Sequence, residues 1–128
     1  MSRVLLIEAD YPLAKSTKQY LRSQGHSVRW QADPQSAVNS ADKWHPDIIV
    51  LDLVLGSHNG VEFLYEFRSY PEWLTVPIII YSSLSPQALT GSEAALADLT
   101  ISAYLYKPDA NLAALANAIA KHSATVTA

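Results

Sequence analysis

Five short runs of apolar residues recur along the chain, separated by stretches long enough to hold helices. The runs are Val4 to Ile7, Val28 to Trp30, Ile48 to Leu51, Val76 to Tyr81 and Ala103 to Tyr106. The first, third and fourth are continuously apolar, which is typical of strands buried on both faces of a parallel sheet. The second is more mixed, which favours a position at an edge of the sheet.

The stretches between these runs carry signals for helix starts. At residues 33–34 and 85–86, a capping Asp or Ser precedes a proline. Proline suits the first position of a helix because the amide hydrogen that it lacks has no hydrogen-bond partner within the helix there. Asn59 followed by Glu62 resembles a capping box that opens a third helix. A last amphipathic helix is predicted from Asp109 to about His122.

Strands that alternate with helices five times predict an α/β fold, a doubly wound five-stranded parallel sheet with helices on both faces. The length of 128 residues predicts one domain, which we assign to residues 1–122, followed by a flexible C-terminal tail at 123–128. Such a sheet binds ligands at the carboxyl ends of its strands.

Composition narrows the function classes. The chain has no cysteine, which excludes disulfides and thiolate metal sites. The N-terminal apolar run stops at Glu8, too early for a signal peptide, and no apolar run is long enough to span a membrane. The net charge of -3 gives no electrostatic reason to expect direct nucleic-acid binding. We therefore expect a cytoplasmic protein that does not insert into a membrane.

Four polar residues close four of the apolar runs. Glu8 follows the first, Asp52 the third, Ser82 ends the fourth and Lys107 follows the fifth. Because carboxyl ends of parallel strands share one rim, these side chains are expected to converge. The two carboxylates favour Mg2+, which needs only one or two carboxylates besides water and phosphate oxygens. Phosphate is the natural anion for such a site.

Four segments in order, Leu5 to Glu8, Pro46 to Leu53, Pro77 to Ser83 and Tyr104 to Pro108, resemble a response-regulator receiver domain of the CheY type. The resemblance covers residues 3 to 122. It implies the flavodoxin-like strand order 2-1-3-4-5 and a role in two-component signalling. The chain is then expected to accept a phosphoryl group and not to be an enzyme, with self-catalysed phosphotransfer and slow autodephosphorylation at most.

The resemblance also implies roles for individual residues. Asp52 is the expected phospho-acceptor for a histidine kinase or phosphotransfer protein. Glu8, Asp52 and the backbone carbonyl of Val54 are expected to hold Mg2+, while Lys107 and Ser82 contact the phosphoryl oxygens. The physical requirement is positioning and charge neutralisation of those oxygens.

Three further features follow from the same resemblance. Ser82 and Tyr104 are expected to form the switch that responds to phosphorylation. Lys107-Pro108 matches a bond that is cis in the family. A downstream protein is expected to bind the face made by the fourth helix, the fifth strand and the last helix, and the sequence leaves open whether the chain forms a homodimer.

The chain departs from the family pattern in three places. Ala9 stands where a second metal-binding acid is usual, which predicts weak Mg2+ binding. Asp10 either substitutes for that acid or simply caps the first helix, and in the second case the binding stays weak. The interval from Ser82 to Lys107 is a few residues longer than usual. Val54 and Leu84, at positions that set the rate of phosphate loss, are both apolar, which predicts a long-lived phosphoryl group.

The main alternative is a degenerate receiver, with weak or lost Mg2+ and phosphoryl chemistry, that acts as a protein interaction module. Ala9 is the feature that separates the two hypotheses. A haloacid-dehalogenase-type phosphatase would need an aspartate two residues after Asp52, where this chain has Val54. Dinucleotide binding is disfavoured because no glycine-rich turn follows the first apolar run.

Overall fold

The computed structural model describes residues 2–56, 58–89 and 99–123, which form a three-layer α/β sandwich. The strands are β1 (Arg3–Ile7), β2 (Ser27–Gln31), β3 (Ile48–Leu51), β4 (Val54–Leu55), β5 (His58–Asn59), β6 (Ile78–Ser82) and β7 (Ala103–Tyr106). The helices are α1 (Tyr11–Ser23), α2 (Pro34–Trp44), α3 (Gly60–Arg68) and α5 (Leu112–His122), with 3-10 turns η1 (Pro71–Trp73), η2 (Pro86–Leu89) and η3 (Lys107–Asp109).

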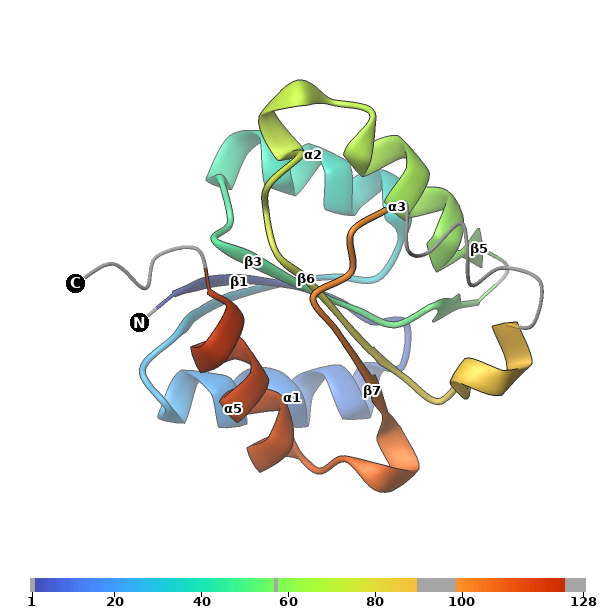
Figure 1. The fold of residues 1–128 in the computed structure, drawn as a ribbon. Coiled ribbons are helices and arrows are strands. Elements are labelled where there is room, and N and C mark those ends of the chain that lie inside the picture. The colour runs from blue at the N-terminus through green and yellow to red at the C-terminus, as the bar shows by residue number, and fades with distance from the viewer. Residues whose placement is uncertain (1, 57, 90–98, 124–128) are drawn as a thin grey trace.

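The main sheet has the strand order β2-β1-β3-β6-β7, and every pairing in it is parallel. With the five apolar runs numbered in chain order, this is the predicted order 2-1-3-4-5. Helices α2 and α3 cover one face of the sheet and α1 and α5 cover the other (Figure 1). The predicted doubly wound α/β fold is therefore confirmed.

Alternating side chains of the central strands build the two halves of the core. Leu5, Ile49 and Ile80 belong to the cluster under α2 and α3. Leu6 and Val50 belong to the cluster under α1 and α5. Strands β3 and β6 are buried along their whole length, as their continuous apolar sequence predicts.

The helix starts agree with the sequence in part. Asp33 caps α2 by accepting from the amide of Ser36, as predicted. The last helix begins at Leu112 rather than Asp109, because residues 107–109 form a 3-10 turn and the side chain of Asn111 caps the helix instead. Residues 86–89 form a 3-10 turn, and the predicted continuation into a fourth helix lies outside the described residues.

Two other features differ from the sequence-based prediction. A small antiparallel hairpin, β4 with β5, lies between β3 and α3. The described residues contain no cis peptide bond, so the Lys107-Pro108 bond is trans and that expectation is wrong here. Pro108 instead lies in the turn η3 directly after β7.

The packed body includes Ser123, which ends α5, is buried, and lies in hydrogen-bond contact with Ser2. Residues 124–128 lie outside the described part of the chain. Within the described part, no helix is both long enough and apolar enough to cross a bilayer.

Candidate functional site

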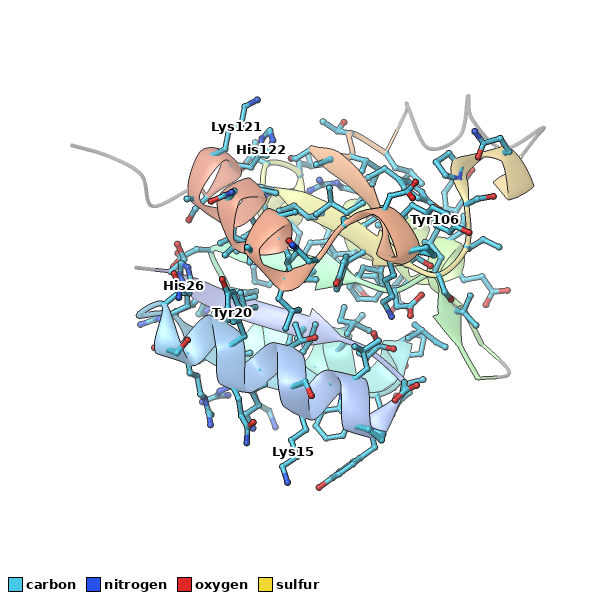
Figure 2. The ribbon with its side chains drawn as sticks, turned by 90° about the horizontal axis from the view of Figure 1, so that it is seen from below. Lys15, Tyr20, His26, Tyr106, Lys121 and His122 are labelled. Atoms are coloured by element: carbon cyan, nitrogen blue, oxygen red, sulfur yellow. The ribbon has the colours of Figure 1, made fainter. Side chains whose placement is uncertain are left out.

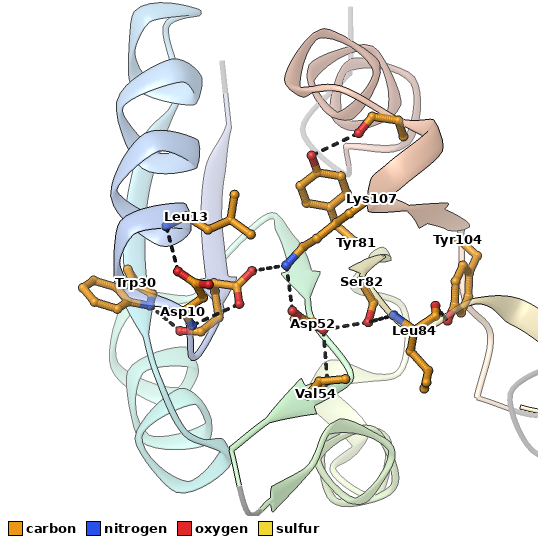
Figure 3. A network of polar contacts seen from close by, with 12 residues as sticks. Asp10, Leu13, Trp30, Asp52, Val54, Tyr81, Ser82, Leu84, Tyr104 and Lys107 are labelled. Carbon is orange, nitrogen blue, oxygen red and sulfur yellow. Dashed lines mark hydrogen bonds and ion pairs between the residues drawn. The ribbon is translucent and has the colours of Figure 1, made fainter. Parts of the chain in front are cut away.

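The carboxyl ends of β1, β3, β6 and β7 bring the four predicted polar side chains together (Figure 3). The Nζ atom of Lys107 lies 2.6 Å from Oε1 of Glu8 and 2.7 Å from Oδ2 of Asp52. The hydroxyl of Ser82 donates to Oδ1 of Asp52 at 2.6 Å. Glu8, Asp52 and Lys107 directly follow β1, β3 and β7, and Ser82 ends β6, so four of the five strands of the main sheet position the site.

Asp52 is the most heavily hydrogen-bonded group of the site. Besides the contacts from Lys107 and Ser82, Oδ1 accepts the amide hydrogen of Val54 at 2.9 Å. Asp52 is only 4% exposed. Burial alone would raise its pKa, but the hydrogen bonds from Lys107, Ser82 and Val54 outweigh burial, so the pKa lies below its ordinary value. The carboxylate is therefore anionic at neutral pH.

Glu8 has the opposite shift. Burial raises its pKa, the hydrogen bond from Lys107 lowers it, and repulsion from Asp52 raises it again, so the net direction is upward. Its other oxygen accepts the backbone amide hydrogen of Asp10, with a separation of 3.2 Å. Asp52 accepts more hydrogen bonds than Glu8. The repulsion between the two buried carboxylates therefore raises the pKa of Glu8 and not that of Asp52.

Lys107 forms ion pairs with both carboxylates at once. Burial would lower the pKa of its ammonium, but the hydrogen bonds to Asp52 and Glu8 raise it above its ordinary value. The ammonium also lies 5.6 Å from the ring centroid of Tyr81, whose hydroxyl donates to the carbonyl of Ala110. The aromatic ring and the two carboxylates hold the ammonium at the rim of the sheet.

A chain of hydrogen bonds connects Asp52 with the predicted switch residue Tyr104. Ser82 Oγ accepts the amide hydrogen of Leu84 at 3.1 Å, and the Tyr104 hydroxyl donates to the carbonyl of Leu84 at 2.5 Å. The backbone N–H and C=O groups of Leu84 thus link the Asp52–Ser82 pair to the side chain of Tyr104 on β7.

Asp10, considered above as a substitute metal ligand, does not point into the site. The side chain of Asp10 is exposed and caps α1, with Oδ1 3.1 Å from the amide nitrogen of Leu13. Ala9 is also exposed and contributes no donor. Among the described residues, no group of three or more acidic, His or Cys side chains is arranged to hold a metal ion.

The sequence analysis missed Trp30 and Tyr81 as neighbours of the site. The indole N–H of Trp30 donates to the backbone carbonyl of Glu8 at 2.7 Å. Trp30 had the pattern of a half-buried packing residue, and the sequence carries no local signal for a contact across 22 residues. For Tyr81, its position directly before Ser82 on an inner strand was the available signal.

Comparison with known proteins agrees with the observed fold. Residues 4–120 match the family model described as response regulator receiver domain. The chain is 30% identical to the KDP operon transcriptional regulatory protein KdpE of Escherichia coli (strain K12), an alignment that covers 98% of this chain and 54% of that relative. The chain thus spans about half the length of this curated relative.

Two solved structures have closely similar folds. The chemotaxis protein CheY4 of Vibrio cholerae has a TM-score of 0.81 at 23% identity, covering 95% of this chain and 98% of that chain. The receiver domain of the sensor histidine kinase PA1611 of Pseudomonas aeruginosa PAO1 has a TM-score of 0.79 at 28% identity, covering 94% and 96%. That structure is described as having a magnesium ion coordinated in the active site cleft.

Proposed function

The chain belongs to the response-regulator receiver family, and on that basis we propose that Asp52 accepts a phosphoryl group from the phosphohistidine of a histidine kinase or phosphotransfer protein. The observation that carries the proposal is the buried Asp52 carboxylate, in contact with the Lys107 ammonium at 2.7 Å and the Ser82 hydroxyl at 2.6 Å. An anionic nucleophile and two donors are thereby held at one point.

The proposed step is a direct transfer. A carboxylate oxygen of Asp52 attacks phosphorus, the P–N bond of the phosphohistidine breaks, and the imidazole leaves with the electron pair and takes up a proton. Lys107 and Ser82 release part of their contact with Asp52 and donate to the equatorial phosphoryl oxygens, where charge must be neutralised. The low pKa of Asp52 keeps the nucleophile deprotonated.

Mg2+ fits this donor set, because the ion is commonly held by one or two carboxylates together with water and phosphate oxygens. Glu8 and Asp52 would supply the carboxylates and Val54 a backbone carbonyl. When bound, the ion supplies further neutralisation of phosphoryl charge. Ala9 offers no oxygen in its side chain, and Lys107 already contacts both carboxylates, so weak Mg2+ binding is proposed.

The output is proposed to be a shift in the Ser82, Leu84 and Tyr104 hydrogen-bond chain. A phosphoryl group on Asp52 draws the Ser82 hydroxyl away from the carboxylate, and the amide of Leu84 follows because it donates to that hydroxyl. The Tyr104 hydroxyl is bound to the same residue, so its position changes with the loop. A partner protein bound at β7 and α5 would sense that change.

A second candidate, the degenerate receiver that acts as an interaction module, is favoured by two observations. Ala9 removes one expected acid, and both oxygens of Asp52 are already hydrogen-bonded to groups of the protein. An incoming phosphoryl group must compete with these donors. If the phosphoryl group cannot displace these donors, the chain would act only by binding partner proteins through its surface.

The test is mass spectrometry of the intact protein after incubation with phosphoramidate and Mg2+. The proposal expects one added phosphoryl group in the parent chain and in Asp42→Asn, an exposed control, but none in Asp52→Asn. Absence of the adduct at high Mg2+, together with failure to bind beryllium fluoride, would overturn phospho-acceptance and favour the interaction module. An adduct that persists in Asp52→Asn would overturn the assignment of the acceptor.

A further inference from the structure

In the part of the chain that the structure describes, strand β2 pairs with β1 on one side, and its other side is an unpaired edge of the main sheet. The amide of Ser27 donates to Ser2, and the carbonyl of Gln31 accepts from Glu8, so residues 27, 29 and 31 direct their backbone groups toward β1. Because the backbone N–H and C=O groups of successive residues in a strand point to opposite sides, those of Val28 and Trp30 point away from β1. The outward carbonyl of Val28 is already bound by Arg22, at 3.3 Å.

Two shallow grooves flank this edge, one on each face of the sheet. The groove beside α1, of about 240 Å³, is lined by Tyr11, Lys15, Lys18, Gln19, Arg22 and Trp30. The groove beside α2, of about 270 Å³, is lined by Arg29, Gln31, Ser36, Asn39, Ser40 and Lys43. Each groove therefore meets β2 at a side chain of the strand itself, Trp30 on one face and Arg29 on the other.

The charge of these grooves is the reverse of the charge of the chain. The net charge is -3, yet five of the nine Lys and Arg residues line the two grooves, and neither described lining contains a carboxylate. The carboxylate of Asp33 accepts from the hydroxyl of Ser36, which lines the α2 groove. By contrast, the groove between α2 and α3 is lined by Asp33, Glu62 and Glu66 without a cation.

We propose that the β2 edge binds an extended acidic segment of another protein, which adds to the sheet as a further strand. The amide hydrogens of Val28 and Trp30 supply backbone donors, and alternate side chains of the added strand reach the two faces of the sheet. Acidic side chains on one face would meet Lys15, Lys18 and Arg22. Those on the other face would meet Arg29 and Lys43.

Charge argues against a second copy of this chain as the occupant. Pairing β2 with β2 would bring two sets of these cations together, which is repulsive. The strand at the opposite edge, β7, has the sequence Ala-Tyr-Leu-Tyr and offers no acid. The acidic groove beside α3 is formed by helices, which cannot pair with the backbone of β2. An acidic extended peptide satisfies both the charge and the backbone requirement.

The experiment uses the whole chain and a seven-residue peptide of glutamate and threonine with blocked ends. NMR would follow the amides of Val28 and Trp30 and their rate of hydrogen exchange during the titration. We expect both amides to shift and their exchange to slow at least severalfold. A peptide of the same charge, N-methylated at alternate amides, tests whether backbone pairing is required, and we expect it to bind at least tenfold more weakly.

Matched charge reversals locate the peptide. Lys15→Glu and Lys43→Glu change one groove each, whereas Lys121→Glu makes the same charge change on the exposed end of α5 (Figure 2). We expect the first two to weaken binding severalfold and the third to leave it within twofold. The proposal is overturned if no exchange protection develops at millimolar peptide, or if the N-methylated peptide binds equally well. Concentration-dependent self-association that protects the same amides would also overturn it, in favour of a second copy.

Discussion

Replacement of Lys107 by methionine would isolate what the ammonium does for the two buried carboxylates. Methionine keeps much of the aliphatic length of lysine but removes the charge and the donor. The side chains of Glu8 and Asp52 are each 5% exposed, and that of Lys107 is 13% exposed, so water screens these contacts little. The variant leaves two carboxylates in a buried site without their shared cation.

The expected loss of unfolding free energy near neutral pH is about 3 kcal/mol, the lower end of the range for breaking a buried ion pair. The lower end applies because Asp52 keeps its donors from Ser82 and Val54. Glu8 keeps a single backbone donor, so it is the carboxylate that is expected to take up a proton. This protonation limits the loss.

The sign of the pH dependence follows from Glu8. Its folded-state pKa is already above the ordinary value of 4.5 and rises further without Lys107. A group with a raised folded-state pKa contributes stability below its unfolded pKa and loses that stability as the pH rises through the folded pKa. The difference between the parent chain and Lys107→Met therefore shrinks as the pH falls from neutrality toward 4.5.

Urea unfolding followed by tryptophan fluorescence, near neutral pH and again about two units lower, measures both quantities. Lys121→Met, at an exposed lysine, is the control and should change stability by less than about 0.5 kcal/mol. The double variant Lys107→Met with Glu8→Gln should recover part of the loss. A loss under about 1 kcal/mol, or one equal at both pH values, would refute the view that Lys107 compensates two buried charges.

Three other predictions test the site and its support. Ala9→Asp should raise Mg2+ affinity by about 10-fold or more, measured by titration of the Trp30 indole resonance, and unchanged affinity would count against a missing acid as the limiting factor. Gly60→Ala should cost about 1–3 kcal/mol in urea unfolding, because the new Cβ would lie 2.7 Å from Cα of Leu53; a neutral substitution would contradict that packing. If Asp52 is phosphorylated, apolar Val54 and Leu84 should slow its hydrolysis, and a half-life of seconds by mass spectrometry would argue against such shielding.

The sequence predicted the main sheet and its strand order because the signals for strands are local. Three runs without polar residues, at β1, β3 and β6, are almost wholly buried in the structure. The start of α2 was predictable for the same reason, since Asp33 caps a turn only three residues away. The small β4–β5 hairpin was not predictable, because strands of two residues are too short to show an alternating pattern.

The start of the last helix shows where local signals compete. Asp109 and Asn111 both have capping side chains, and the sequence does not rank them. The direction of the chain after β7 determines which residue caps the helix. Asp109 lies within the 3-10 turn at residues 107–109, so the side chain of Asn111 accepts the amide hydrogen of Ala114 instead. Helix boundaries of this kind depend on the preceding strand.

By itself, the sequence determined which residues end the strands, and therefore that Glu8, Asp52, Ser82 and Lys107 meet at one rim. The tertiary structure alone decided how they share charge. Lys107 lies 99 residues from Glu8 and 55 from Asp52 along the chain, so no local pattern encodes their separation or burial. Those two quantities set the electrostatic energy, and they move the pKa values of the two carboxyl groups in opposite directions.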